Sequence, residues 1–330
     1  MANRSPAKRR WLLLLIIHMV ITSGLVSSFL TKNINSQNPS YPPIIIIESL
    51  STTLRVFRPA FQRNLDFDPS REDTDINVTV LGGGNFGLAL ATVLANQPHV
   101  SKVTLLLRSN DISNHINVHH THPKYFPEIE LPPKICATAN PRHAFPTNTK
   151  CIVQAVPVQF SRKLLQSISY FVPPHIPILS ASKGIESDTL SFMDELLSDC
   201  LGHDRAYAFL SGPSFAKEVR QGLATAVVVA SNDFRVANFF SDLLSSPTFR
   251  VFTSKDVMGV ELGGAVKNVI ALAAGMCEGL GLGTNAMSAL VTRGCAELHR
   301  LGKALGAKPG TLSGLSGRLT RLLLHVTKPT

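Results

Sequence analysis

Three glycines in the first half of the chain have a spacing that suits phosphate binding. Gly82, Gly84 and Gly87 form a G-x-G-x-x-G turn between a β-branched apolar run and a segment rich in Ala and Leu. The first glycine of such a turn permits a sharp bend, the second admits a pyrophosphate, and the third lets the helix pack on its strand. The helix start then offers free N–H groups and a positive dipole end to the phosphates. The sequence therefore predicts a dinucleotide site, whose contacts we assign to Gly82, Gly83, Gly84, Asn85, Phe86 and Gly87.

An arginine stands where the choice between the two nicotinamide dinucleotides is usually made. NAD-specific folds place an Asp or Glu about 20 residues past the glycine turn, where it holds a ribose hydroxyl. This chain has Arg108 there, which suits a 2′-phosphate or stacks on adenine, whereas Asp111 lies close enough to reach a ribose. The sequence favours tolerance of NADP and leaves NAD as the alternative.

Four histidines, at positions 115, 119, 120 and 122, form a dense cluster ahead of Pro123. A metal site is one interpretation, and a solvated loop is the other. No second Cys/His group with ligand spacing supports a metal, so we favour the loop and expect no metal. The five cysteines are scattered singly without a C-x-x-C motif, which indicates reduced, buried thiols.

Short apolar runs bounded by Pro, Gly and Ser recur after the glycine turn, with helical segments such as Leu190–Leu201 between several of them. The runs expected to be strands are 103–107, 151–156, 176–181, 207–210 and 225–230. This alternation predicts a mostly parallel, doubly wound sheet of the Rossmann type over residues 74–253. From Asp256 the chain becomes rich in Ala, Leu and Gly, so the start of an all-α domain is expected over 254–330, with helices at 257–274 and 286–305.

Three further stretches, taken with the glycine turn, resemble a known enzyme family. They are Ser180–Glu186 (SASKGIE), Leu210–Glu218 (LSGPSFAKE) and Asp256–Ala271 (DVMGVELGGAVKNVIA). In this order and spacing they resemble the NAD(P)-dependent sn-glycerol-3-phosphate dehydrogenases, in their bacterial and plastid branch, over roughly residues 76–317.

The resemblance implies an activity and roles for individual residues. The activity is hydride transfer between sn-glycerol 3-phosphate and dihydroxyacetone phosphate with NAD(P)(H), which feeds glycerolipid synthesis. Lys267 matches the family's general acid/base and Lys183 its second active-site lysine, and a buried lysine can have its pKa lowered toward working pH. The implied substrate contacts are Lys183, Gly212, Ser214, Lys267 and Asn268. The implied cofactor contacts outside the turn are Arg108, Phe160, Lys183 and Ala216.

The chain departs from the family pattern near its end. Gly314–Gly317 matches the family's GLSG, but the Gly-Asp-Leu segment and the Arg-Asn pair expected next are absent, and residues 318–330 read RLTRLLLHVTKPT. We therefore expect a C-terminally truncated substrate domain, with a homodimer if the chain is complete. Two alternatives stay open, namely a nucleotide-binding protein without turnover and another two-domain reductase of the ketopantoate or 6-phosphogluconate type.

The N-terminus has the features of a targeting leader. Basic residues precede an apolar run from Trp11 to Val26, which closes with small residues as a secretory signal does. Residues 31–40 contain Ser and Asn but no acid, like a transit peptide. Over 1–40 we expect a leader that directs the chain to an organelle, with a plastid favoured over the ER, the secretory pathway or a membrane anchor. Residues 41–73 are expected to be a linker.

The net charge of +10 does not indicate nucleic-acid binding. Of the 32 lysines and arginines, five lie in residues 1–40 and six in residues 298–330, and neither segment holds an acid. The body between them has 21 basic and 22 acidic side chains. A nearly neutral body with basic ends is not the electrostatic footprint of a nucleic-acid-binding protein. We expect membrane contact only through an uncleaved leader.

Overall fold

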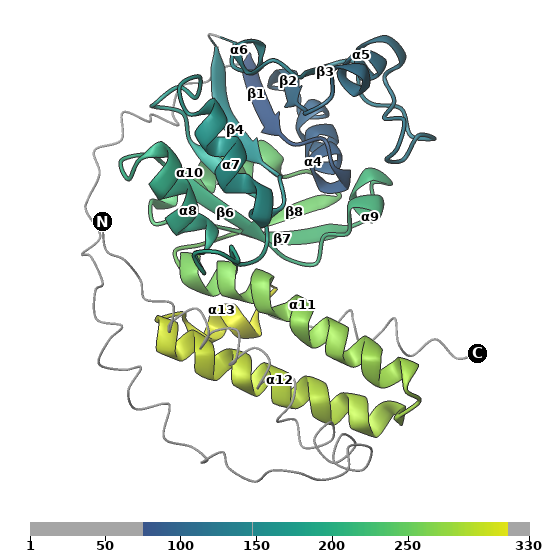
Figure 1. Cartoon of the computed structure of the whole chain (residues 1–330), viewed down its shortest axis with the longest axis vertical. Helices are drawn as coiled ribbons and strands as arrows, with labels where there is room; N and C mark the ends of the chain where they lie inside the picture. Colours follow the sequence, from purple (N-terminus) through teal and green to yellow (C-terminus); the bar gives the residue numbers. More distant parts are fainter. Residues whose placement is uncertain (1–74, 147, 316–330) are drawn as a thin grey trace.

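The computed structural model describes residues 75–146 and 148–315 (Figure 1). The expected leader (1–40), the expected linker (41–73) and the divergent segment after Gly317 lie outside the described residues.

An eight-stranded sheet forms the centre of the larger part of the molecule. Its strands are β1 (Ile76–Leu81), β2 (Val100–Leu106), β3 (Ile135–Thr138), β4 (Thr149–Gln154), β5 (Ile178–Ser180), β6 (Tyr207–Ser211), β7 (Thr225–Ala230) and β8 (Phe249–Ser254). Their order is β3-β2-β1-β4-β5-β6-β7-β8, and every neighbouring pair is parallel except β6 and β7. The expected doubly wound, mostly parallel sheet is confirmed.

Two of these strands were not predicted, and both lie at the edges of the sheet. The β3 strand has four residues, which is too short to stand out as an apolar run. In β8, buried Phe249 and Val251 alternate with exposed Arg250 and Phe252. An edge strand that is covered on one face shows this alternation, whereas the central strands are buried on both faces and read as continuous apolar runs.

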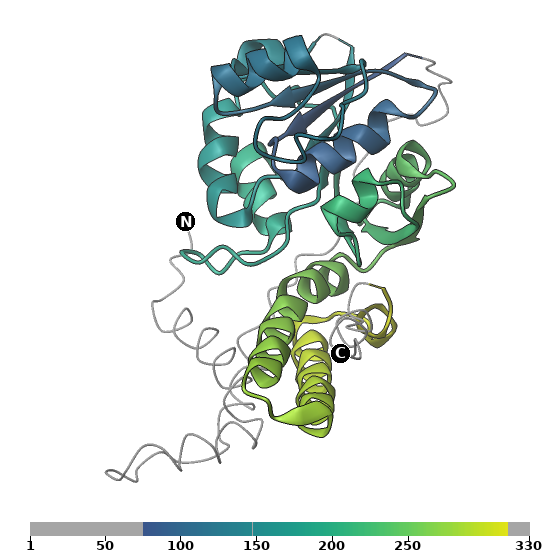
Figure 2. The ribbon, with the colours of Figure 1, turned by 90° about the vertical axis from the view of Figure 1, so that its right-hand side faces the viewer.

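Helices cover both faces of the sheet (Figures 1 and 2). One core cluster joins the sheet to α4 (Asn85–Ala95), α5 (Asn110–His119), α9 (Ala216–Arg220) and α10 (Phe234–Leu244). A second cluster, on the other face, includes side chains of α6 (Pro141–Ala144), α7 (Val158–Ile168) and α8 (Met193–Leu201). The helix expected at 190–201 is α8, which starts three residues later than predicted. Leu190 cannot belong to it, because this residue adopts a left-handed conformation with φ +57°.

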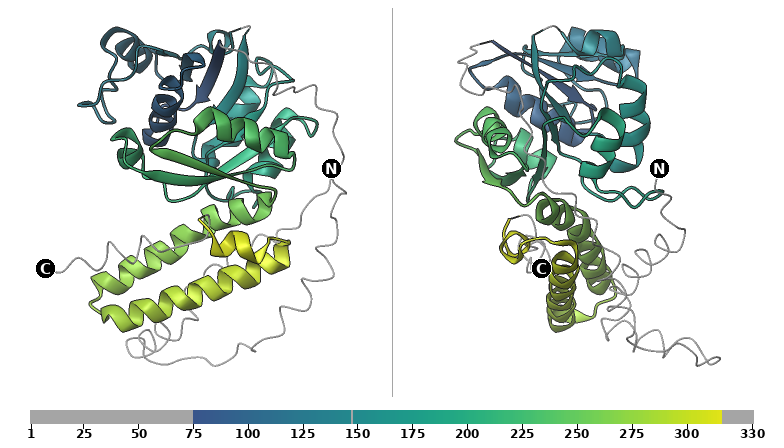
Figure 3. Two further views of the ribbon diagram at one scale, coloured as in Figure 1. Left: turned by 180° about the vertical axis from the view of Figure 1, so that it is seen from behind. Right: turned by 90° about the vertical axis from the view of Figure 1, so that its left-hand side faces the viewer.

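Three helices follow the sheet and pack beneath it (Figures 1 and 3): α11 (Val257–Gly279), α12 (Gly283–Leu305) and α13 (Pro309–Ser313). The short turn between α11 and α12 makes them antiparallel neighbours, and it contains Gly281 and Gly283 at positive φ. Ile270 approaches Gly294 so closely that a Cβ there would lie 3.0 Å from its side chain. Both helices are longer than predicted because this pairing buries their facing apolar stripes.

The first of these helices is long and apolar enough to cross a membrane by length and composition alone. More than half of its most apolar window, 56%, is buried inside the protein, against the sheet and α12. Its N-terminus is fixed by Asp256, whose Oδ1 accepts from Gly259 N at 3.0 Å and whose Oδ2 accepts from Lys308 N at 2.8 Å. Asp256 therefore joins the start of α11 to the start of α13, while Val257 and Val260 pack into the second core cluster and hold this end of α11 against the sheet.

Candidate active site

The glycine turn between β1 and α4 has the geometry of a phosphate cradle. Gly82 has φ +102°, a conformation that side-chain-bearing residues rarely adopt. A Cβ at Gly87 would lie 2.1 Å from the carbonyl oxygen of Gly82, so the helix can pack this closely only with glycine there. A Cβ at Gly84 would meet nothing within 4 Å, so this position faces open space at the helix start. The arrangement fits a pyrophosphate.

The remaining residues of the turn extend the cradle in two directions. Asn85 begins α4 and is exposed, while a Cβ at Gly83 would collide with the end of the Leu107 side chain. Phe86 is partly buried against the core, and its ring centre lies 5.2 Å from Lys183 Nζ. The glycine turn and the motif that carries Lys183 are therefore adjacent in the fold.

Arg108 lies two residues beyond β2, the neighbour of β1 in the sheet, and its side chain is exposed. Ser109 caps α5 by accepting from Ile112 N at 3.3 Å, which places Asp111 in the first turn of that helix. Because parallel strands end at one edge of the sheet, Arg108 is on the same edge as the glycine turn. Its side chain is free to meet a ligand bound along that edge.

Two lysines from different parts of the chain converge on one backbone oxygen. Lys183 follows β5, and its Nζ lies 3.4 Å from the carbonyl oxygen of Gly212; Lys267 Nζ, from α11, donates to the same oxygen at 3.0 Å. Gly212 has φ +146°, and a Cβ there would lie 2.9 Å from Val227 Cα, so only glycine fits at this point. The end of β6 is thus shaped to present this carbonyl to both ammonium groups.

Burial makes the charged form of both lysines unfavourable. Burial, and next the positive charge of Lys267, lower the pKa of Lys183 from the ordinary 10.5 to about 7. Burial also lowers the pKa of Lys267. A lysine with a pKa near the working pH can both give and take a proton.

Glu186 and Glu261, which belong to the two lysine motifs, have hydrogen-bond partners other than the lysines. Glu186 pairs with Arg162 at 2.8 Å, and Glu261 accepts from Asp194 N at 3.1 Å. Within residues 75–146 and 148–315, neither Lys183 nor Lys267 forms an ion pair. The site therefore brings together two basic amines without a counter-ion from these residues, and an anionic ligand bound there would favour their protonated form.

The other predicted site residues lie at different distances from this centre. Ser214 Oγ is 3.4 Å from the carbonyl oxygen of Gly212, so this residue joins the lysine pair. Ala216 starts α9 and packs against the core that contains α4. Phe160, on α7, is 62% exposed, and Asn268 is exposed beside Lys267. In the part of the chain that the structure describes, Phe160 and Asn268 make no hydrogen bond to the lysines.

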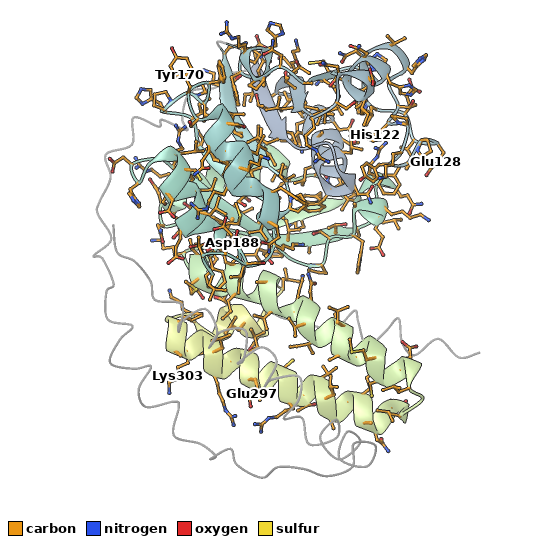
Figure 4. All side chains as sticks on the ribbon, viewed as in Figure 1. His122, Glu128, Tyr170, Asp188, Glu297 and Lys303 are labelled. Atoms are coloured by element: carbon orange, nitrogen blue, oxygen red, sulfur yellow. The ribbon has the colours of Figure 1, made fainter. Side chains whose placement is uncertain are left out.

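The expected solvated loop is wrong for the histidine cluster, because His115 and His119 lie on α5, His120 is the C-cap of that helix and His122 is buried in the turn that follows. Nδ1 of buried His122 accepts from Lys124 N at 3.1 Å and from Tyr125 N at 3.0 Å, which closes the turn after α5. His115 Nε2 bonds to Thr121 Oγ1 at 3.2 Å. Figure 4 labels His122 close to α4 and away from α11. Among the described residues, no group of three His, Cys, Asp or Glu side chains is placed to hold a metal.

Sequence reasoning missed two features of the site. The Arg162–Glu186 ion pair joins two residues that are 24 positions apart in the sequence, and no local sequence pattern predicts it. A Cβ at Gly264 would lie 2.8 Å from Ser211 Oγ, so this glycine permits the close approach of α11 to β6. Adjacent glycines at 263 and 264 inside a helix are a signal that could have been used for the second feature.

A doubly wound sheet with a glycine turn after its first strand, facing a helical part that contributes a lysine, is the architecture of two-domain NAD(P)-dependent dehydrogenases. The sequence model of the NAD-dependent glycerol-3-phosphate dehydrogenase N-terminus matches residues 77–237, and that of the C-terminus matches residues 256–329. The chain belongs to the NAD(P)-dependent glycerol-3-phosphate dehydrogenase family. The second match includes residues 318–329, which contain neither the Asp nor the Arg-Asn pair expected from the family pattern.

Curated relatives and a crystal structure agree with this assignment. The chloroplastic NAD(+) glycerol-3-phosphate dehydrogenase 2 of Arabidopsis thaliana is 45% identical over 241 residues, covering 73% of this chain and 57% of the relative. The NAD(P)+ glycerol-3-phosphate dehydrogenase of Lawsonia intracellularis is 44% identical over 250 residues, covering 73% and 70%. The glycerol-3-phosphate dehydrogenase of Coxiella burnetii has a TM-score of 0.71 at 32% identity, covering 77% of each chain.

The alignment covers only part of the length of the chloroplastic relatives. This chain spans 57% of the Arabidopsis protein and 56% of the chloroplastic rice protein. The family match favours the glycerol-3-phosphate dehydrogenase interpretation over the ketopantoate or 6-phosphogluconate type of reductase.

Proposed function

We propose that this protein binds NAD(P)(H) and interconverts sn-glycerol 3-phosphate and dihydroxyacetone phosphate. The observation that carries the proposal is the convergence of Lys183 and Lys267 on the Gly212 carbonyl, next to a glycine turn that fits a pyrophosphate. Two lysine amines without a counter-ion among the described residues can take up protons beside a phosphorylated substrate, and an amine of lowered pKa suits proton transfer at the substrate's carbonyl oxygen.

The proposed reaction divides the work between the cofactor and the lysines. A nicotinamide dinucleotide held at the glycine turn would supply or accept the hydride at the C2 carbon of the substrate. In the reducing direction, a lysine ammonium gives a proton to the C2 oxygen as the C2–H bond forms, and in the oxidising direction the neutral amine takes that proton back. Lys267 is assigned as this proton donor, because it has the shorter bond to Gly212 O and lies on the helix that faces the sheet.

Lys183 and the remaining predicted residues are assigned to binding. Lys183 lies between the Phe86 ring of the glycine turn and Lys267, so it is placed to contact both cofactor and substrate. Ser214, next to Gly212, and Asn268, next to Lys267, are proposed to hold the substrate. Arg108, Phe160 and Ala216 are proposed to hold the cofactor, with Arg108 facing a 2′-phosphate when the ligand is NADP.

A second candidate function is nucleotide binding without turnover. This chain spans only 57% and 56% of the chloroplastic relatives, so the alignment does not show that every part needed for turnover is shared. The Arg-Asn pair that the family pattern leads one to expect for the substrate phosphate and the cofactor is also absent from residues 318–330.

The names of two relatives and the sequence of the leader support a proposal for the cellular setting. Two relatives carry chloroplastic in their names, and the first 40 residues of this chain read as a targeting leader. We place the protein in a plastid, where the reaction would supply glycerol 3-phosphate to glycerolipid synthesis. Entry into the ER or secretory pathway, or a membrane anchor, is the alternative, and a homodimer stays a prediction.

The deciding experiment uses the purified full chain. NADH and NADPH binding is followed by nucleotide fluorescence, and dihydroxyacetone phosphate is then added while oxidation of the nucleotide is recorded. Binding followed by turnover supports the dehydrogenase. Binding without turnover establishes the second candidate, and absence of binding to both nucleotides would overturn both functions.

A further inference from the structure

The loop that follows Lys183 carries acidic side chains that could neutralise this lysine. Glu186 is three residues away, and three residues span at most about 11 Å, which the two long side chains together can bridge. Asp188 follows in the same loop and is exposed; Figure 4 shows it where the sheet meets α11. A carboxylate paired with Lys183 would hold the lysine in its charged form.

The Glu186 carboxylate is held by an arginine on α7. Arg162 Nε lies 2.8 Å from Oε1 and 3.0 Å from Oε2 of Glu186, and Arg162 Nη2 lies 2.9 Å from Oε2. Thr189 Oγ1 also donates to Oε2, and the Glu186 side chain is only 7% exposed. A charged, fork-shaped contact of this kind is among the strongest that a carboxylate can make.

The rest of the loop is tied to the same helix. Gln159 Nε2 donates to Ile185 O at 2.9 Å, and Gln159 Oε1 accepts from Ser187 N at 3.0 Å. Burial would raise the pKa of Glu186, but the hydrogen bonds from Arg162 and Thr189 and the charge of Arg162 hold it below its usual value. Glu186 is therefore a carboxylate that already has a cation beside it, although Arg162 also pairs with the exposed Asp199 at 3.4 Å.

The other carboxyl group near Lys183 favours its neutral form. Glu261 lines the same small cavity as Lys183, of about 10 Å³, from α11. Burial, and next the negative charge of Asp194, raise its pKa well above the usual value, so this group favours its neutral form. The charged group that acts on Lys183 is then Lys267, which opposes protonation.

We propose that Arg162 is a positioning residue that sequesters Glu186, so that Lys183 faces no carboxylate and stays able to exchange its proton. This role for Arg162 rests on the proposed function, since a proton-exchanging lysine matters only in an active site. Its geometry stands independently, in the three contacts between Arg162 and Glu186.

The experiment measures the titration of Lys183 directly, by NMR of the full chain with isotope-labelled lysine Cε. The Lys183 signal is identified by its loss in Lys183→Arg. In Arg162→Met, freed Glu186 should pair with Lys183 and raise the titration midpoint by about one to three pH units. The double variant Arg162→Met/Glu186→Gln removes that carboxylate charge and should return the midpoint to that of the wild type.

The double variant separates charge sequestration from mere support of the loop. If Arg162 only held the loop in place, the double variant would be as perturbed as Arg162→Met, and the proposal would be wrong. An unchanged midpoint in Arg162→Met would equally overturn it. Arg235→Met is the matched control, because Arg235 pairs with Asp233 at 2.7 Å on α10. If Arg162→Met fails to fold, Arg162→Lys keeps a cation without the fork and should give a smaller shift in the same direction.

This readout does not depend on turnover. A chain that binds no nucleotide, or that binds it without reducing dihydroxyacetone phosphate, would fail the test of the proposed function and still give a Lys183 titration. The experiments therefore distinguish failure of the proposed dehydrogenase function from failure of the positioning role of Arg162.

Discussion

Lys183 and Lys267 lie 84 positions apart in the sequence, one after a strand of the sheet and one on a helix beneath it, yet both donate to the carbonyl oxygen of Gly212. The distance between the two ammonium groups is therefore set by how α11 seats against β6. Gly264 and Gly212 allow that seating, because a Cβ at either position would collide with the facing backbone or side chain. The chemistry of the site depends on this junction.

The lowered pKa of Lys183 leads to a prediction about proton uptake on ligand binding. At pH ~8 Lys183 is mostly neutral, because burial and next the charge of Lys267 lower its pKa to about 7. A dianion bound beside it favours the ammonium form, so binding should take up as much as about one proton. Calorimetry in buffers of different ionisation enthalpy measures this uptake when sn-glycerol 3-phosphate is added to the NADH complex. That pair cannot react, because both partners are reduced.

The Lys183→Met variant is the control for proton uptake. It should bind sn-glycerol 3-phosphate more weakly and without the uptake seen in the wild type. Equal uptake in the two proteins would assign the proton to another group.

The same lysine should make stability depend on pH. Its pKa of about 7 in the folded protein lies below the ordinary 10.5 of the unfolded chain, so the unfolded state binds more protons between these values and stability rises with pH across that window. Below about pH 7 the folded protein carries the full penalty of a buried charge. Lys183→Met should therefore raise the melting temperature most below about pH 7, with a gain that shrinks as the pH approaches 10.5.

Thermal unfolding at several pH values tests this expectation. Lys303→Met changes an exposed lysine on α12, labelled in Figure 4, and serves as the control. A gain in Lys183→Met that is constant with pH would show that the side chain, and not its charge, is responsible.

The glycine turn gives a prediction that separates binding from folding. Gly84 has φ −74° and ψ 175°, which valine adopts readily, and its Cβ would point into open space. Gly84→Val should therefore fold normally but lose NADH and NADPH binding in a fluorescence titration, because its side chain occupies the place of the phosphates. Gly275→Val, at another open position, should bind as the wild type does.

Gly87→Ala should behave in the opposite way to Gly84→Val. Its Cβ would lie 2.1 Å from Gly82 O, so the strand and helix would be forced apart and thermal stability should fall. Unchanged nucleotide affinity in Gly84→Val would remove the claim that this turn holds the cofactor.

Features that depend on local rules could be predicted from the sequence, whereas those that depend on tertiary pairing could not. The glycine turn, the central strands and α11 could be predicted because each needs particular residues at fixed short spacings. The edge strands β3 and β8 do not, since one is short and the other alternates. The Arg162–Glu186 contact joins two elements that only the fold brings together, and a lone Arg and a lone Glu look the same on any surface.

Arg108 allows a test of cofactor preference. If its guanidinium meets the 2′-phosphate, Arg108→Asp loses a charge-assisted contact worth about 1.5–3 kcal/mol. NADPH affinity should then fall about tenfold to a hundredfold, while NADH affinity changes little. Arg250→Asp, at an exposed position on β8, should leave both affinities as they are. Equal losses for both nucleotides would show that Arg108 stacks on the adenine instead.

The final prediction concerns the proton donor. Lys267→Ala removes the amine that donates to Gly212 O at 3.0 Å and should lower kcat for reduction of dihydroxyacetone phosphate by about 10²–10⁴-fold. NADH affinity should stay close to that of the wild type, because the glycine turn lies on the sheet and α11 does not form it. The measurement is single-turnover oxidation of NADH by the full chain, with nucleotide affinity determined on the same samples.

Added methylamine provides the sharper part of this test. A small primary amine can enter the space left by the Lys267 side chain and donate the missing proton, so the rate of Lys267→Ala should rise with methylamine concentration. Rescue should follow the pH at which the amine is protonated in the reducing direction. A Lys267→Ala variant that keeps the wild-type kcat would show that the proton comes from elsewhere, with Lys183 the next group in line, since it contacts the same carbonyl oxygen.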